Sequence, residues 1–300
     1  MPHALGYHVA VPDLMSLTSR AGNRTTKPNS GAGVETGQRI RRVVAEGRIS
    51  SAYQPIYCLA SREIIGYEAL ARFPDFPKLP VALWFEQADQ LGLTVELELA
   101  AIRAALNAIE LLATDAWLAI NASPLTLGSP RLSALLARHD PTRIVLEITE
   151  HSPIVDYEDL ARTIAPLRHS GARLAIDDVG AGFASLRHIL ALAPEIIKLD
   201  STLTHGLTTE PTKRALIRAL VSFAAEIGAL IIAEGVETQS TAEQLDRLGV
   251  QHAQGYHLAR PAPQTHPARI DLYATPPGLG SPRDHARSGA PSVPVAAVGP

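Results

Sequence analysis

The sequence has almost no cysteine, since Cys58 is the only one in 300 residues. A single thiol excludes a disulfide framework and a multi-cysteine zinc site within one chain, and it is typical of a reducing compartment. Long apolar runs are also missing: none approaches the roughly 20 residues that a membrane span needs. The N-terminus has no charged start followed by an apolar core, as a secretory signal would. We therefore expect a cytoplasmic protein without a membrane span.

A strong charge of one sign is absent as well. The formal net charge is −3, which argues against a general binder of polymeric nucleic acid. The eleven histidines are scattered, and none falls in the HExxH spacing of a zinc hydrolase. What the chain does have is 46% apolar residues, enough to form a sizeable core.

Both ends read as tails. Residues 1–36 and 275–300 are rich in Pro, Gly, Ser and Thr and offer little to bury, so we expect them to be disordered or weakly ordered. Residues 37–274 remain as one domain. Its length is close to that of a single eight-unit barrel, which takes about 250 residues.

The domain begins with a helix expected over Arg39–Gly47 and a hairpin of two strands, Ala52–Cys58 and Glu63–Leu70. Apolar residues at helical spacing predict surface helices over Leu79–Leu93 and Glu96–Ala113. Short apolar runs then alternate with amphipathic segments. The expected strands are Trp117–Asn121, Ile144–Ile148, Leu174–Asp178, Ile196–Asp200, Leu230–Glu234 and His252–Gly255. The expected helices are Pro124–Arg138, Asp156–Ser170, Phe183–Leu192, Thr209–Ile227 and Thr238–Leu248. Eight strands, most of them alternating with helices, predict a closed (β/α)8 barrel.

Polar side chains follow nearly every strand. They are Glu68, Asn121, Glu147 with Glu150, Asp177 with Asp178, Lys198 with Asp200, Glu234 with Glu237, and Gln254. Any one of them taken alone is better interpreted as a helix cap or a salt-bridge partner. Because the carboxyl ends of barrel strands meet at one rim, seven strands with such residues predict a functional site there.

The adjacent pair Asp177 and Asp178 is followed by Gly180 and Gly182, which permit a tight turn. Neighbouring side chains on a strand point to opposite sides. The pair is therefore either a shared metal site or one functional acid beside a structural one, and helix capping is a third interpretation.

Five of these carboxylates would repel one another strongly if they met at one rim: Glu68, Glu147, Asp177, Asp178 and Glu234. Lys198 is the only lysine among the rim residues. Such a group must take up protons or cations. Oxygen ligands favour Mg²⁺ or Mn²⁺ over zinc. Two such ions at one site are typical of phosphoester hydrolysis.

These residues are recognisable as a set. The motifs are YQPI at Tyr53–Ile56, GYEALAR at Gly66–Arg72, IN at Ile120–Asn121, LEITE at Leu146–Glu150, DDVGAGFASL at Asp177–Leu186, IKLD at Ile197–Asp200, AEGVET at Ala233–Thr238 and QGYHLARP at Gln254–Pro261. With these motifs in this order, residues 40–263 resemble the EAL-domain phosphodiesterases of bacterial cyclic di-GMP signalling. The resemblance implies a barrel whose first strand is antiparallel to the rest.

The resemblance also implies roles. Two Mg²⁺ or Mn²⁺ ions would be held by Glu68, Asn121, Glu147, Asp177, Asp178 and Glu234. Catalysis would involve Glu234, Lys198 and Asp178, and substrate would be bound by Gln54, Leu70, Arg72, Asp200 and Gln254. Glu150 would anchor the loop after the paired aspartates, and Asp200 would pair with Lys198 or Arg72. Glu237 is better interpreted as a structural salt-bridge partner.

The implied reaction is hydrolysis of one phosphodiester of 3′,5′-cyclic di-GMP to linear 5′-pGpG by a homodimer. The loop after the aspartates departs from the family pattern DDFGTGYSSL at Val179, Ala181, Phe183 and Ala184. These changes remove hydroxyl groups from a loop thought to couple metal binding to dimerisation. Two alternatives to a cyclic di-GMP phosphodiesterase remain. One is a catalytically weak domain that serves as a cyclic di-GMP receptor or docks a partner, and the other is a different two-metal phosphohydrolase on the same barrel.

Overall fold

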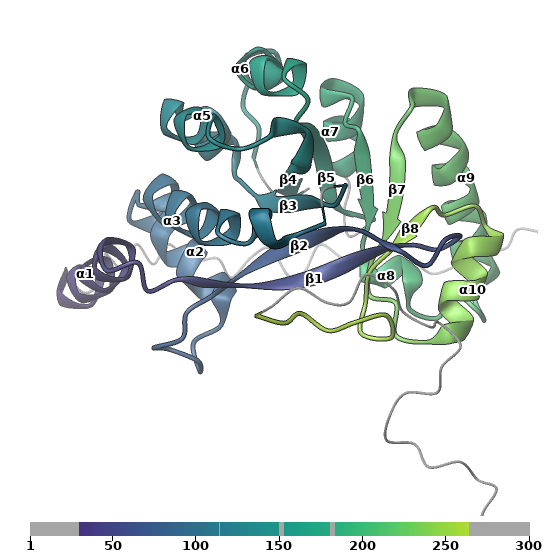
Figure 1. The fold of residues 1–300 in the computed structure, drawn as a ribbon, viewed down its shortest axis with the longest axis horizontal. Helices are drawn as coiled ribbons and strands as arrows, with labels where there is room; N and C mark the ends of the chain where they lie inside the picture. Colours follow the sequence, from purple (N-terminus) through teal and green to yellow (C-terminus); the bar gives the residue numbers. More distant parts are fainter. Residues whose placement is uncertain (1–29, 114, 150–152, 181–183, 264–300) are drawn as a thin grey trace, which may run out of the picture.

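The fold is a closed barrel of eight strands, seen in a computed structural model that describes residues 30–113, 115–149, 153–180 and 184–263 (Figure 1). The strands follow one another around the barrel in sequence order. β1 runs antiparallel to its neighbours β2 and β8, and the other neighbouring pairs are parallel. This confirms the predicted barrel with an antiparallel first strand. The strands are β1 Ser50–Cys58, β2 Ile64–Arg72, β3 Trp117–Asn121, β4 Ile144–Thr149, β5 Arg173–Val179, β6 Ile196–Leu199, β7 Leu230–Ala233 and β8 His252–Ala253.

Helices surround the barrel, and α1, α2 and α3 gather at one end of the molecule (Figure 1). The α-helices are α1 Ser30–Ala45, α2 Val81–Gln90, α3 Thr94–Leu106, α4 Pro124–Leu127, α5 Pro130–Leu136, α6 Tyr157–His169, α7 Ala184–Leu192, α8 Ser201–Thr204, α9 Pro211–Ile227 and α10 Gln239–Arg247. Two 3-10 turns are η2 Ile109–Leu111 and η3 Pro141–Arg143. None of the described helices is long and apolar enough to cross a bilayer.

Several of the expected helices differ in their bounds. The first, α1, begins at Ser30 rather than Arg39, inside the segment 1–36 that was expected as a tail. The segment expected as one helix over Pro124–Arg138 is divided into α4 and α5, because Pro130 lacks a backbone N–H and disfavours helical geometry at Ser129. Ser129 instead caps α5 by accepting a hydrogen bond from the Arg131 backbone N–H. The helix expected over Glu96–Ala113 ends at Leu106 and is followed by η2.

The hairpin of β1 and β2 sets the register of the candidate site. Its strands pair so that Gln54 lies opposite Glu68. On the far edge of β1, the Tyr53 backbone N–H donates to the Ala262 carbonyl at 2.7 Å. The chain segment after β8 is thereby held against β1, next to the carboxyl end of the barrel.

Apolar side chains fill the barrel interior. They are Ile56, Trp117, Ala119, Val145, Ala175, Ile196 and Ile232. Trp117 packs directly against Gly66 of β2, where an added Cβ would lie only 2.4 Å from the indole Cδ2. A separate cluster between α1, α2 and α3 centres on Trp84, whose ring stacks on Phe73 at 4.2 Å. The interior of the barrel is thus packed, and polar chemistry is confined to its ends.

Candidate active site

Polar side chains from β2 to β8 meet at the carboxyl end of the barrel. Register brings them together, since Asn121 pairs with Glu147 across β3 and β4, and Thr149 pairs with Asp177 across β4 and β5. The buried members are Glu68, Glu147, Asp177, Lys198 and Gln254. Glu234 directly follows β7 and joins them. Of the rim residues that the strand ends predicted, the structure thus brings together Glu68, Asn121, Glu147, Asp177, Lys198, Glu234 and Gln254.

Lys198 lies at the centre of this group. Its side chain is fully buried, and its Nζ lies 3.3 Å from Glu68, 3.0 Å from Glu147, 3.1 Å from Asp177 and 2.8 Å from Glu234. We call these four acids and Lys198 the acidic cluster. One ammonium group cannot neutralise four carboxylates, so the cluster attracts further positive charge.

Burial raises the pKa of the acids in the cluster. It raises the pKa of Glu234 to about 8 and also raises the pKa values of Glu147 and Asp177, although the charge of Lys198 opposes each shift. For Lys198, burial lowers the pKa, but the four carboxylates together hold it well above its ordinary value. The Lys198 ammonium group therefore stays protonated. The four acids share its single positive charge.

Asp177 and Asp178 face the same site despite being adjacent on β5. The pairing of β5 with β6 shifts register between Ile176 and Val179, and Asp178 has a left-handed backbone with φ of 60°. Its N–H donates to Asp177 Oδ1 at 2.9 Å. This bulge cancels the alternation of a regular strand, so the shared-site interpretation fits the geometry.

The acids form two groups that could each hold a metal ion: Glu68, Glu147 and Asp177, and Asp177, Asp178 and Glu234. Within each group, oxygen atoms lie within 4.8 Å of one another, and Asp177 belongs to both. Hard divalent cations prefer such oxygen ligands. The donor set thus fits two Mg²⁺ or Mn²⁺ ions with one shared carboxylate.

Two amides border the cluster. Gln254 Nε2 donates to Glu68 Oε2 at 2.6 Å and to Glu234 Oε1 at 2.9 Å, so it links the strands on either side of β1. Asn121 Nδ2 lies 3.5 Å from Glu68 Oε1 and from Glu147 Oε2. Both amides therefore lie where the sequence predicted them.

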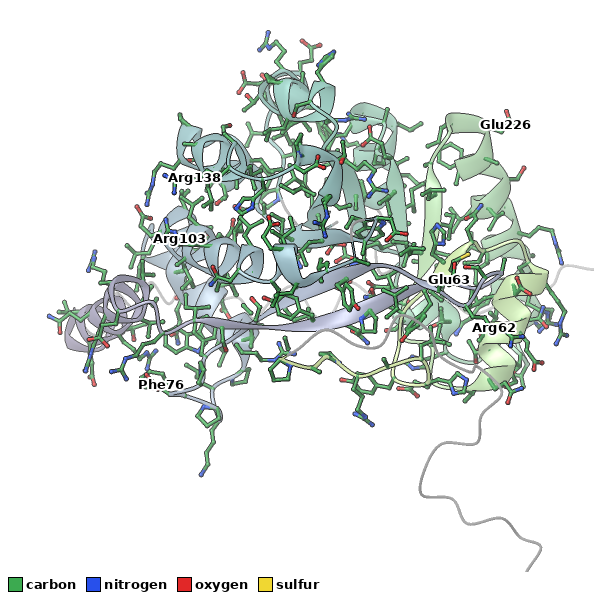
Figure 2. All side chains as sticks on the ribbon, in the orientation of Figure 1. Arg62, Glu63, Phe76, Arg103, Arg138 and Glu226 are labelled. Carbon is green, nitrogen blue, oxygen red and sulfur yellow. The ribbon has the colours of Figure 1, made fainter. Side chains whose placement is uncertain are left out.

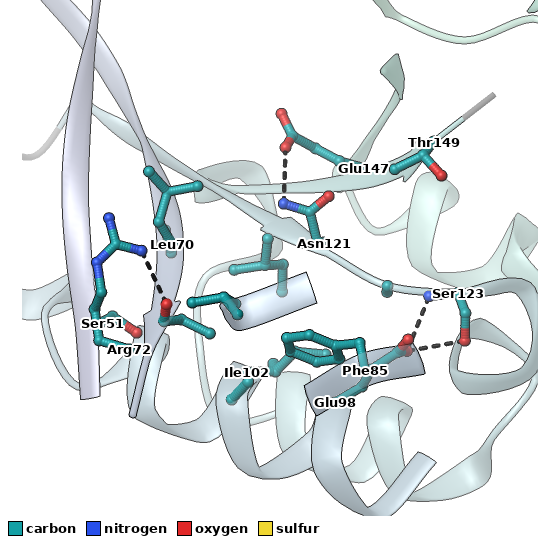
Figure 3. A pocket seen from close by; sticks show the side chains of 16 residues that line it. Ser51, Leu70, Arg72, Phe85, Glu98, Ile102, Asn121, Ser123, Glu147 and Thr149 are labelled. Atoms are coloured by element: carbon teal, nitrogen blue, oxygen red, sulfur yellow. Dashed lines mark hydrogen bonds between the residues drawn. The ribbon is translucent and has the colours of Figure 1, made fainter. Parts of the chain in front are cut away.

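A cavity of about 470 Å³ opens on one side of the cluster (Figure 3). We call it the apolar cavity, because Leu70, Val81, Phe85 and Ile102 contribute to its lining together with Glu147 and Asn121. Arg72 also lines it, and its guanidinium donates to the Ala71 carbonyl at 2.9 Å.

The sequence did not single out Glu98, another residue of this lining (Figure 3). Its Oε2 accepts hydrogen bonds from the backbone N–H and the hydroxyl of Ser123, both at 2.9 Å. Burial raises the pKa of Glu98, although these bonds oppose the shift. The sequence carries one indication of this position: Glu98 is an acidic residue on the core-facing side of a predicted amphipathic helix.

A second cavity, of about 420 Å³, opens on the other side of the cluster. We call it the acidic mouth. Gln54 lines it, and its Nε2 donates to the Ala259 carbonyl at 3.1 Å. The remaining lining residues are Glu68, Asp177, Asp178, Ser201, His205, Glu234, Gly235, Glu237, Gln254, Gly255 and Tyr256. Ser201, His205 and Tyr256 were not predicted, because they follow their strands without carrying a metal-ligand pattern.

Two of the predicted rim residues, Asp200 and Glu237, lie outside the acidic cluster. Asp200 was expected to pair with Lys198 or Arg72, but it caps α8 instead, with Oδ1 accepting the Thr202 backbone N–H at 2.8 Å. Asp200 directly follows β6 and is the N-cap residue of α8, so its carboxylate is used by that helix. Glu237 Oε1 lies 3.6 Å from His205 Nε2, with both side chains more than half exposed, in line with a surface ion pair.

The loop after the aspartates is described in part. Val179 is buried, and Gly180 has φ of 115° with Leu203 so close that a Cβ would lie 2.5 Å from Leu203 Cδ1. A glycine is therefore required at that position. Ala184 begins α7. The predicted loop anchor Glu150, and Ala181 and Phe183, lie outside the described residues.

An eight-stranded barrel with an antiparallel first strand and an oxygen-rich site at its carboxyl end defines a TIM-like barrel with a candidate divalent-metal centre. The comparison with protein families narrows this class. The chain belongs to the EAL domain family, whose model matches residues 38–261.

Relatives of the chain include named phosphodiesterases. Cyclic di-GMP phosphodiesterase RocR from Pseudomonas aeruginosa is 34% identical over 252 residues, which cover 76% of this chain and 61% of RocR. A signaling protein from Caulobacter vibrioides is 30% identical over 234 residues, covering 75% of this chain and 29% of that protein. The chain thus spans less than two thirds of either relative.

Solved structures agree in fold. The PaMucR phosphodiesterase in complex with c-di-GMP is 27% identical, with a TM-score of 0.68 and coverage of 76% of this chain and 98% of that one. The EAL domain of Xanthomonas citri FimX, in complex with c-diGMP, has a TM-score of 0.71 at 18% identity and covers 80% of this chain and 98% of that one. The FimX likeness shows the fold alone.

Proposed function

We propose that the chain hydrolyses one phosphodiester bond of 3′,5′-cyclic di-GMP to linear 5′-pGpG with the help of two Mg²⁺ or Mn²⁺ ions. The observation that carries this proposal is the pair of acid groups that share Asp177 at the carboxyl end of the barrel. The substrate is proposed from the names of the relatives, among them RocR. A cytoplasmic location, expected from the cysteine content, is part of the same proposal.

The metal-holding residues follow from the two groups. Glu68, Glu147 and Asp177, together with the Asn121 amide oxygen, would hold one ion, and Asp177, Asp178 and Glu234 the other. When bound, such ions lower the pKa of water and neutralise charge on a phosphoryl group.

The other residues would act on water and phosphate. Glu234 would orient the attacking water and accept its proton, while the Lys198 ammonium group, fixed 2.8 Å from Glu234, would stabilise negative charge on the phosphate. Arg72 would bind phosphate with its planar fork of donors.

The two cavities suit a substrate with two bases. The apolar cavity and the acidic mouth flank the cluster, so a cyclic dinucleotide could place one base in each while its scissile phosphate lies over the acids. Leu70 in the first cavity, and Gln54 and Gln254 in the second, would contact it.

The alternative is a cyclic di-GMP receptor without turnover. The complete set of acids favours the enzyme, since a receptor has no need of two metal groups. The test is incubation of purified protein with cyclic di-GMP and Mg²⁺ or Mn²⁺, followed by chromatographic separation of the nucleotides. Formation of pGpG supports the enzyme. Binding without product supports the receptor, and neither binding nor product contradicts both.

We also propose a homodimer that uses α7. Leu186 and Leu190 lie one helical turn apart on α7 and are 54% and 74% exposed. Val155, in the segment before α6, is 98% exposed. Since α6 and α7 pack together, these side chains offer an apolar face to a second copy of the chain.

A further inference from the structure

A third cavity opens at the amino end of the barrel, opposite the acidic cluster. We call it the amino-end cavity. Its volume is about 680 Å³, and it shares no lining residue with the two cavities at the carboxyl end. Five strands contribute their first residues to it: Ile64, Trp117, Arg173, Leu230 and His252. The proposed hydrolysis makes no use of this cavity.

Arg173 is held in a fixed position in this lining. Its guanidinium carbon lies 5.1 Å from the centre of the Trp117 ring, in a cation–π arrangement. The indole in turn packs against the Gly66 backbone. The donors of Arg173 are therefore positioned before any ligand arrives, which reduces the entropy lost on binding.

The guanidinium has no anionic partner in the part of the chain that the structure describes. No carboxylate there lies within 4.0 Å of it, and no oxygen there accepts its hydrogen bonds. Glu195, the acid whose charge acts on it most, is already engaged: Oε1 accepts from Arg168 Nε at 3.1 Å, and Oε2 accepts from the Leu174 backbone N–H at 2.8 Å.

A partly buried cation without a partner is unfavourable, because burial removes part of its hydration. Burial accordingly lowers the pKa of Arg173, although an arginine stays charged at neutral pH. Burial also lowers the pKa of the neighbouring His252, and the charge of Arg173 lowers it further. The inner part of the cavity thus holds the positive charge of Arg173, beside an imidazole that resists protonation.

The lining also contains two exposed acids: Glu63 at the β1–β2 turn (Figure 2) and Asp115 before β3. Both side chains are exposed, so they lie in the outer part of the cavity, where an entering ligand passes them. Like charges repel, and the two acids therefore disfavour ligands with several negative charges.

We propose that the amino-end cavity binds a small oxyanion with a single negative charge, a carboxylate or a phosphate monoanion, held by Arg173. The guanidinium fork matches both kinds of ligand. This site is independent of the proposed phosphodiesterase activity.

The chain offers a direct reporter, because Trp84 and Trp117 are its only tryptophans. In the full chain carrying Trp84→Phe, fluorescence reports on Trp117 alone. We expect acetate or phosphate, titrated at pH 6 and constant ionic strength with sodium chloride as the balancing salt, to change this emission saturably. The dissociation constant should be on the order of millimolar. Saturation by acetate alone or by phosphate alone identifies the kind of oxyanion, and a response no different from that to chloride overturns the proposal.

Two variants test whether Arg173 is responsible for the change in Trp117 emission. Arg173→Met keeps the apolar stem but removes the charge, and it should weaken binding at least tenfold. Arg103→Met, on α3 and away from Glu63 in Figure 2, should leave binding unchanged. Equal affinity in Arg173→Met overturns the proposal.

Asp115→Asn gives a test that does not depend on how well Arg173→Met folds. Removing this carboxylate should tighten binding about twofold to fivefold, because one repulsive charge is lost. Unchanged or weaker binding in Asp115→Asn contradicts an anion at this site.

Discussion

The Lys198 ammonium nitrogen lies 2.8 Å from Glu234 Oε1 and also contacts acids of three other strands. The chain thus supplies one cation of its own to the oxygens that would hold divalent ions. Lysine and metal stabilise the same carboxylates, so each should matter more when the other is missing.

This relationship predicts the behaviour of Lys198→Met. Without its ammonium group the buried acids lose their counter-charge, and breaking such a buried network costs about 3–5 kcal/mol. We expect the variant to be destabilised by about this amount in EDTA at pH 8, with Mg²⁺ restoring a large part of the loss. Urea unfolding with and without Mg²⁺ measures both effects. The exposed Lys78→Met should stay within about 0.5 kcal/mol of the natural chain. Equal stability of Lys198→Met and the natural chain in EDTA would contradict the counter-charge role.

Glu68→Ala tests the proposed metal site. Loss of a direct ligand should reduce turnover of cyclic di-GMP by more than the 10–100-fold typical of supporting residues. Turnover is followed by the release of pGpG. The exposed Glu226→Ala on α9 is the control and should retain full activity (Figure 2). Full activity in Glu68→Ala would break the metal assignment.

Two variants of Asp178 separate the effect of its backbone conformation from the effect of its carboxylate. Its left-handed backbone, with φ of 60°, is tolerated by asparagine but costs a β-branched residue about 1–2 kcal/mol. We expect Asp178→Asn to keep its unfolding free energy within about 0.5 kcal/mol while losing most turnover, and Asp178→Val to lose both. Denaturant unfolding and turnover assays distinguish the two variants. If Asp178→Asn were as active as the natural chain, the carboxylate would have no role in catalysis.

Glu98 predicts a dependence of stability on pH. Burial raises its folded-state pKa above the unfolded value of about 4.3. Its contribution to stability is therefore fully present below that value and is lost as pH rises through the folded-state pKa. Relative to the natural chain, Glu98→Gln should become progressively more stable as pH rises above about 4, as measured by urea unfolding. The control is Glu96→Gln on the same helix, where the carboxylate side chain is 43% exposed. A stability difference that does not change with pH would refute this prediction.

Leu190→Glu tests the proposed dimer. A charge placed on the exposed face of α7 would have to be buried against a second copy, so the variant should sediment as a monomer at concentrations where the natural chain is dimeric. Leu111 is just as exposed, at 75%, but belongs to η2 and not to α6 or α7. Leu111→Glu should leave the assembly unchanged. A dimer that persists in Leu190→Glu would exclude this face.

The strand pattern predicted the architecture because parallel strands need apolar cores and deliver their carboxyl ends to one rim. The meeting of Glu68, Glu147 and Asp177 followed directly from that rule. The orientation of Asp178 did not, since a register shift in β5 depends on how β6 pairs with it. The burial of Glu98 likewise arises from the packing of α3 over β3, a tertiary contact that helical periodicity alone does not reveal.

The antiparallel pairing of β1 with β8 has a consequence for how the chain folds during synthesis. Tyr57 and Cys58 of β1 pair with Ala253 and His252 of β8, which are among the last residues of the family match to leave a ribosome. Until then β1 has one open edge, where another strand could attach. Ring closure is therefore expected to be the final and slowest step of folding, because it joins the most distant parts of the sequence.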